Sequence, residues 1–101
     1  MSKIQAAFIF VAPETDVAIH HSVIETPILV LHIAGVKNYD EAETVAKDLV
    51  GRGVGAIELC AGFGNEGTAR IAKAVGDKAV VGTVRFDLHP AFGHQSGDKL
   101  F

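Results

Sequence analysis

Residues 56–67 read AIELCAGFGNEG, and this stretch decides the expected fold. Residues 56–60 form a short apolar run typical of a strand, and residues 62–67, here called the glycine turn, match G-x-G-x-x-G. An amphipathic helix is expected to follow over residues 66–75. A strand, a glycine-rich turn and a helix in this order form the context in which the backbone of a protein approaches a phosphate group.

Working outward, three further apolar runs predict strands over residues 6–11, 28–36 and 79–86. Asn38, with Glu41 three residues later, is typical of the start of a helix, which we expect to end at Gly51. Residues 14–27 allow two interpretations: a short helix capped by Asp16, or an extended excursion.

These elements predict an α/β protein with a small, mostly parallel sheet of three to four strands. The expected order is β-(loop or short helix)-β-α-β-α-β, in Rossmann-like layers, with residues 1–101 as one domain and an irregular C-terminal tail over residues 87–101. Right-handed crossovers place both helices on one face of the sheet unless the strand order reverses. Because an edge or a helix-free face would then need cover, we expect a homodimer or a higher homo-oligomer.

Composition excludes several classes of function. Hydrophobic residues make up 49% of the 101 residues and charged residues 21%, which is ordinary for a globular protein. A net charge of −3 argues against nucleic acid as a partner. The run over residues 6–12 is too short to cross a membrane, and no cleavage-site pattern follows it, so we expect a cytoplasmic protein with no membrane partner.

Ligands of open parallel sheets bind beyond the carboxyl ends of the strands, and this rule predicts a site at the glycine turn. Backbone N–H groups of the turn would hold a carboxylate or phosphate, and the alternative is a tight turn whose helix is capped by the chain's own Glu66. A dinucleotide is disfavoured because the chain is too short for both nucleotide-binding halves. The expected ligand-binding residues are Lys37, Asn38, Gly62, Phe63, Gly64, Asn65, Gly67, Arg85 and Asp87.

Glu58, Cys60 and His89 are the candidate catalytic residues. Glu58 and Arg85 each lie in a run that is expected to be buried, so an ion pair between them is the simplest interpretation, and a general base or a carboxylate clamp is the functional one. Cys60 is either a small buried hydrophobe or a nucleophile next to a helix start.

The tail adds ligand types that zinc or iron accept, at His89, His94 and Asp98. Their spacing matches no strong ligand motif. No metal site and no cofactor is therefore predicted.

Four segments resemble a family of small bacterial proteins of about this length that is classed as a domain of unknown function. They are residues 6–13 (AAFIFVAP), 35–39 (GVKNY), 56–64 (AIELCAGFG) and 84–87 (VRFD). The resemblance implies a compact α/β protein without an assigned activity, so it carries over no catalytic residue. The third and fourth expected strands with their helix also resemble a β-α-β piece of a phosphate-binding barrel, at the level of fold alone.

Three functions follow in order of preference. The first is binding of a small anionic metabolite at the rim of the sheet. The second is an enzyme acting beside a carbonyl group, with Glu58 as base and Cys60 or His89 as its partner. The third is a non-catalytic oligomeric interaction or regulatory protein.

Overall fold

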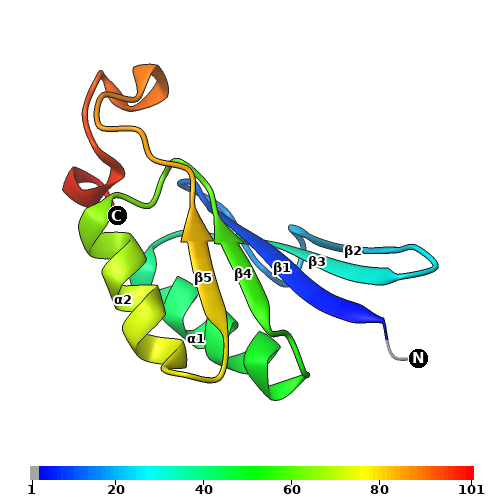
Figure 1. Cartoon of the computed structure of the whole chain (residues 1–101). Coiled ribbons are helices and arrows are strands. Elements are labelled where there is room, and N and C mark those ends of the chain that lie inside the picture. Colours follow the sequence, from blue (N-terminus) through cyan, green and yellow to red (C-terminus); the bar gives the residue numbers. More distant parts are fainter. Residues whose placement is uncertain (1–2) are drawn as a thin grey trace.

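The computed structural model describes residues 3–101 and shows one five-stranded sheet with two helices packed on it (Figure 1). The strands are β1 (Ile4–Val11), β2 (His21–Glu25), β3 (Leu29–Val36), β4 (Ala56–Leu59) and β5 (Val80–Thr83). The helices are α1 (Tyr39–Gly51) and α2 (Asn65–Val75), and two short 3-10 helices, η1 (Pro90–Phe92) and η2 (Gly97–Lys99), lie in the tail. The predicted α/β class is therefore confirmed.

The order of the strands in the sheet is β2-β3-β1-β4-β5. β1 lies in the middle and pairs in parallel with β3 and with β4, and β4 pairs in parallel with β5. β2 runs antiparallel to β3, so the sheet is mixed and has one strand more than the three to four that the sequence predicts. The C-terminal ends of the four parallel strands still meet at one rim, where the glycine turn lies.

The fifth strand arises within residues 14–27, where the sequence allowed a short helix or an extended loop. The Asp16 side chain accepts a hydrogen bond from the amide of Ala18 at 2.9 Å, but this caps a single turn and no helix follows. Thr26 then closes a tight turn: its hydroxyl oxygen accepts from the Leu29 amide at 3.0 Å and its own amide donates to the Leu29 carbonyl at 2.8 Å. This turn folds β2 back along β3 as a hairpin.

Local signals in the sequence account for α1. The side chain of Asn38 accepts a hydrogen bond from the amide of Glu41 at 2.8 Å, as the capping pattern predicts. One stripe of the helix is buried against the sheet and is formed by Tyr39, Ala42, Ala46 and Leu49.

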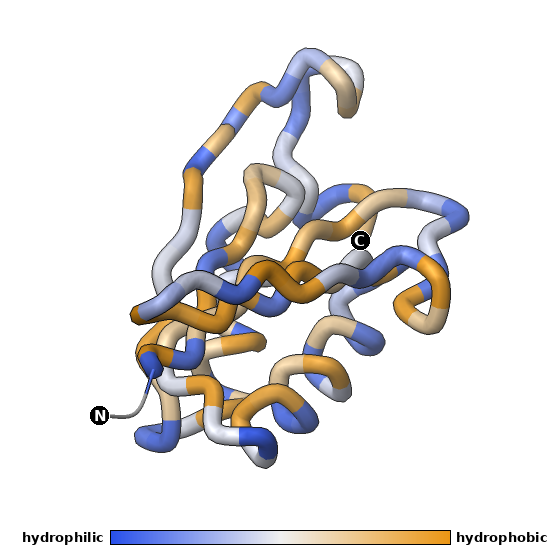
Figure 2. The backbone as a smooth tube through the Cα atoms, turned by 90° about the vertical axis from the view of Figure 1, so that its right-hand side faces the viewer, coloured by the Kyte–Doolittle hydropathy of each residue, from blue (hydrophilic) through white to orange (hydrophobic). Residues whose placement is uncertain are grey.

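The core lies between the helices and one face of the sheet. Alternate residues of β1 and β4, among them Ile9, Ile57 and Leu59, are fully buried there, and Ile71 of α2 packs with them. Figures 1 and 2, a quarter turn apart, show both helices together on the same side of the strands. The predicted placement of the helices on one face is confirmed, and within residues 3–101 no helix lies on the opposite face.

The tail is more ordered than the sequence predicts. β5 ends at Thr83 rather than at Phe86, and the chain then leaves the sheet and forms a projecting loop before it returns to the start of α2 (Figure 1). η1 and η2 are capped by their own polar side chains, since His89 accepts from the amide of Ala91 and Ser96 from the amide of Asp98. Within residues 3–101, no helix is both long and apolar enough to cross a lipid bilayer.

Candidate functional site

The glycine turn connects β4 to α2 at the rim of the sheet, where the sequence places it. Phe63 of this turn is fully buried, and its ring stacks on the ring of Tyr39, with centroids 5.4 Å apart. Gly64 is the residue that precedes the first turn of α2, and as a glycine it offers no side chain to cap the helix. The amide groups at the start of α2 therefore need an acceptor from elsewhere.

Asp98 of the tail supplies that acceptor. One oxygen of its carboxylate accepts from the amide of Glu66 and the other from the amide of Gly67, both at 2.9 Å. The hydroxyl of Tyr39 donates to the same carboxylate at 2.8 Å and accepts from the amide of Gly64 at 3.2 Å. The anion at the glycine turn is therefore the chain's own Asp98, rather than the Glu66 carboxylate that the sequence suggested as a self-cap, and binding of a free anion there stays a prediction.

The glycines of the turn make room for this contact. A Cβ atom at Gly64 would lie 2.4 Å from the carboxylate carbon of Asp98, and one at Gly67 would lie 2.4 Å from the ring of Tyr39. In the tail, a Cβ atom at Gly97 would lie 1.8 Å from the carbonyl oxygen of Gly62. Close approach of the C-terminal segment (residues 96–101) to the turn therefore requires glycine on both sides.

The electrostatics fit a charged Asp98 beside a neutral Tyr39. Partial burial on its own raises the pKa of Asp98, but hydrogen bonds from the amides of Glu66 and Gly67 and from the Tyr39 hydroxyl outweigh it and hold this pKa below its ordinary value. Burial raises the pKa of Tyr39, and the neighbouring Asp98 carboxylate raises it further. The carboxylate is thus the acceptor and the phenol the donor over the ordinary range of pH.

Aromatic rings extend the contact along the tail. Phe101 lies 6.3 Å from Tyr39 and 5.6 Å from Phe92, measured between ring centroids. His89 then stacks between Phe92, at 4.3 Å, and Phe86, at 4.8 Å. A continuous row of rings therefore joins the projecting loop to Phe63 in the core.

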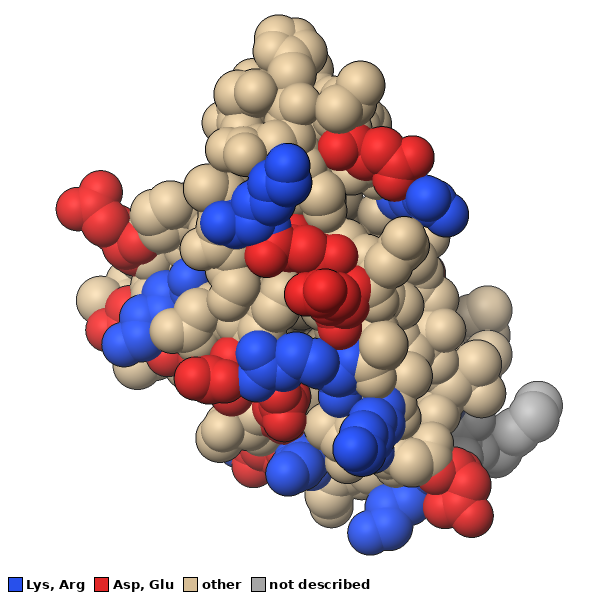
Figure 3. All heavy atoms as spheres, turned by 90° about the vertical axis from the view of Figure 1, so that its left-hand side faces the viewer, with Lys and Arg blue, Asp and Glu red and all other residues tan. Residues whose placement is uncertain are grey.

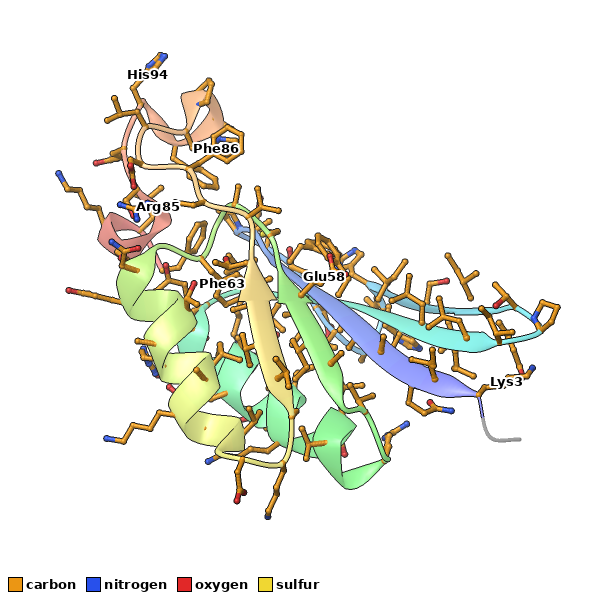
Figure 4. The ribbon with its side chains drawn as sticks, in the orientation of Figure 1. Lys3, Glu58, Phe63, Arg85, Phe86 and His94 are labelled. Atoms are coloured by element: carbon orange, nitrogen blue, oxygen red, sulfur yellow. The ribbon has the colours of Figure 1, made fainter. Side chains whose placement is uncertain are left out.

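The predicted pair of Glu58 and Arg85 is wrong. Arg85 lies beyond the end of β5 and pairs with Asp87 at 2.9 Å, and both of these side chains are exposed. Glu58 lies on the sheet, exposed, on the side away from the helices (Figure 4). The physical reason is that β5 ends two residues before Arg85, and that only one face of the sheet is covered.

The other candidates are spread around the rim. The sulfur of Cys60 accepts from the amides of Gly62 at 3.2 Å and Val11 at 3.5 Å. His89 is occupied with capping η1 and stacking on its neighbours. Lys37 lies 3.9 Å from Glu41, while Asn38 caps α1 and Asn65 is exposed at the start of α2. Among the described residues, no hydrogen bond joins Cys60 to His89 or Glu58 as a nucleophile to a base.

No three His, Cys, Asp or Glu side chains converge on a point within the described part of the chain. His89, His94 and Asp98 therefore do not come together as a ligand set, because Asp98 lies on the glycine turn and His89 within the stack of aromatic rings.

Sequence reasoning missed Tyr39 and Gly97 and gave Asp98 the wrong partners. Tyr39 resembles an ordinary core residue at the start of a helix, and Asp98 follows the glycine turn by more than thirty positions, so no local pattern links them. The short motif Ser96-Gly97-Asp98 is a local signal for the structured turn that carries Asp98.

The face of the sheet opposite the helices, here called the open face, is a second surface of interest. Strand register and side-chain alternation place its residues, and apart from Glu58 and Ser22 all of them are apolar. Ile4 is 60% exposed there, Ile24 49% and Val80 75%. The open face is formed by Ile4, Ala6, Phe8, Phe10, Ser22, Ile24, Leu29, Leu31, Ile33, Gly35, Ala56, Glu58, Val80 and Gly82.

Fold and site together define a small α/β domain whose own tail fills its glycine turn and whose sheet is bare on one face. The chain belongs to the Family of unknown function (DUF6506), whose model matches residues 4–99. The resemblance to a family of unknown function with chains of about this length is thereby confirmed, while a bacterial origin stays a prediction. Neither the curated proteins nor the solved structures contain a match to this chain.

The contact between Asp98 and α2 can be tested by Asp98→Asn. The amide puts N–H donors where the structure needs acceptors, so we expect the free energy of unfolding to fall by about 1–3 kcal/mol, measured by urea denaturation at pH 7. Asp87→Asn is the matched control, because Asp87 makes only an exposed ion pair with Arg85 and its loss should cost about 0–1 kcal/mol.

The contribution of the Asp98 carboxylate to the free energy of unfolding should depend on pH. Because the pKa of Asp98 is lowered by folding, its contribution is complete above the unfolded value of about 3.9 and is lost as the pH falls through the lower folded value. The difference in stability between the native chain and Asp98→Asn should therefore shrink in acid. A difference that is constant from pH 7 to pH 2 would show that the carboxylate charge plays no part.

The close approach of the tail can be tested by Gly97→Ala. The new methyl group would overlap the carbonyl of Gly62, so we expect the C-terminal segment to move off the turn and stability to fall by about 1–3 kcal/mol. Gly55→Ala is the control, since a Cβ atom there meets nothing within 4 Å. In a double-mutant cycle, Gly97→Ala and Asp98→Asn should be strongly non-additive, and simple additivity would contradict a shared contact.

Proposed function

We propose that this protein is a non-catalytic assembly subunit that associates with a second copy of itself through the open face. The observation that carries this proposal is the composition of that face: among the described strand residues that alternate onto it, Glu58 is the single charged one. A contiguous apolar surface of this kind, exposed on a folded domain, marks an interaction site.

The opposite side of the molecule has the character of a solvated surface. Figure 3 shows acidic and basic side chains crowded over the helices. Several form ion pairs, as Arg70 of α2 does with Asp40 and Glu43 of α1. The contrast between a charged helical side and an apolar sheet side supports an association through the sheet.

The open face supplies, as projected area, somewhat more than half of the surface that a stable interface takes from each partner. A stable interface takes about 800 Å² of accessible surface from each partner. Strands spaced about 4.8 Å apart with a rise of about 3.3 Å per residue give this sheet a projected area of about 450 Å², and the accessible surface of its side chains exceeds that projection.

A second copy is the occupant that fits best. Two sheets pack face to face about 10 Å apart with interdigitating side chains, so one open face is complementary to another. A two-fold dimer also closes on itself and leaves neither copy with an uncovered sheet. Homo-oligomerisation is the state that the sequence predicts for a sheet with helices on one face.

The anion-binding and enzyme hypotheses receive less support. The glycine turn binds a carboxylate well, but a free metabolite would have to displace Asp98, which the chain holds at high effective concentration. Within residues 3–101 the Glu58 side chain makes no hydrogen bond, and Cys60 accepts from backbone amides rather than contacting His89. We therefore place the function on the open face.

The proposal can be tested with Leu31→Glu, which puts a second carboxylate into the open face. Burial of an unpaired charge is strongly unfavourable, so we expect the dimer dissociation constant to rise at least about 100-fold. Sedimentation equilibrium measures it, and circular dichroism checks that the monomer stays folded.

Leu88→Glu is the matched control. Leu88 is 68% exposed in the projecting loop, away from the sheet, so this variant should dimerise like the native chain. Two results would overturn the proposal. In one, the native chain stays monomeric at 100 times the protein concentration ordinarily used for sedimentation equilibrium. In the other, the Leu88→Glu variant dissociates as fully as Leu31→Glu.

Glu58→Gln should have the opposite effect. The dimer buries the Glu58 carboxylate among apolar neighbours, since its partners in register are Phe8 of β1 and Gly82 of β5. Removing the charge lowers the cost of desolvation, so we expect the dimer to tighten by about 5- to 50-fold in the same sedimentation experiment. Glu14→Gln, at an exposed position in the loop after β1, should leave the constant unchanged.

A further inference from the structure

A cleft of about 510 Å³ lies at the opposite end of the molecule from the glycine turn. The last turns of α1 and α2 and the connection to β5 form its walls. Its apolar lining includes Val50 and Val75, and three lysines stand around it: Lys47, Lys73 and Lys78. This volume falls within the range of small-molecule sites, about 300–1,000 Å³.

The cleft is lined by a net positive charge, whereas the chain as a whole is negatively charged. Three lysines and one acidic residue, Asp77, give its lining a formal charge of +2 (3 − 1), whereas the chain as a whole carries −3. None of these lysines is in an ion pair within residues 3–101, while Lys3 pairs with Glu25 and Lys37 with Glu41. Half of the six lysines thus gather at one hollow without carboxylate partners.

Stabilisation of a helix end explains the position of only one of the three lysines around the cleft. Lys73 lies in the last turn of α2, where a cation complements the helix dipole. The last turn of α1 holds no basic residue, so Lys47 does not have that role, and Lys78 follows α2 after the end of the helix. A second reason for their convergence is therefore needed.

We propose that this cleft binds a phosphate monoester with an apolar body, for which a nucleoside monophosphate is the simplest representative. Lysine ammonium groups bind phosphate as point charges, and a group with close to two negative charges can engage more than one of them. The apolar lining between the helices takes the uncharged part of the ligand. The site is independent of the open face, because it lies on the helix side of the sheet.

The test uses AMP and UMP as probes, titrated into the isotopically labelled native protein at low ionic strength and followed by NMR. We expect amide shifts to concentrate at residues 73–78 and 47–51, with adenosine and uridine giving none. The triple variant Lys47→Gln/Lys73→Gln/Lys78→Gln should raise the dissociation constant at least about tenfold.

The chain offers a control of equal charge. The variant Lys3→Gln/Lys37→Gln/Lys99→Gln removes the same three positive charges outside the cleft, and binding should change less than about twofold. Equal loss in both triple variants would reduce the effect to net charge and overturn the proposal. Absence of shifts for both probes, or shifts at residues 62–67 instead, would overturn it as well, the latter in favour of the glycine turn. The dimerisation experiments do not depend on either result.

Discussion

The contact on which the rim of the molecule depends is the Asp98 carboxylate at the start of α2. A helix that begins after a glycine has no side-chain cap of its own, and its first amide groups carry a partial positive charge. Asp98 satisfies two of these amides from a distance of more than thirty residues along the chain. It does for α2 what Asn38 does locally for α1, and in doing so it fixes the position of the whole C-terminal segment.

This long-range cap changes the meaning of the glycine-rich pattern. In a nucleotide-binding protein, glycines let the backbone approach the phosphates of a ligand. Here Gly64 and Gly67 let the backbone approach Asp98 and Tyr39. Gly97, in the tail, likewise lets its backbone approach the carbonyl group of Gly62. The physics of the turn is the same in both cases, and only the covalent origin of the anion differs. A motif of this kind therefore predicts an anion, and the remainder of the chain determines whose anion it is.

The parts of the fold that were predictable from the sequence are those set by neighbouring residues. Asn38 and the apolar stripe that follows it predicted α1, and the apolar runs predicted four of the five strands with errors of a few residues at their ends. β2 was not predicted, because its residues are exposed and its pairing depends on a turn at Thr26 rather than on an apolar run. The pairing of Glu58 with Arg85 failed for a related reason: an apolar neighbourhood in sequence was equated with burial on both faces. The partners of Asp98 could not be predicted, because they depend on the path of the entire tail.

The strands of this sheet are apolar on both faces, but helices cover only one of the two faces. Strands that are apolar at nearly every position are adapted to cover on two faces, as in parallel sheets between two layers of helices. Residues 3–101 form a single layer of helices, and Asp98 holds the C-terminal tail on the glycine turn, at the rim of the sheet. Phe8 and Leu31 therefore lie on a face of the sheet that no described helix covers. In the proposed dimer, Asp98 would cap the glycine turn within each chain while a second copy covers the open face, so that the two ends of the problem are met by different contacts.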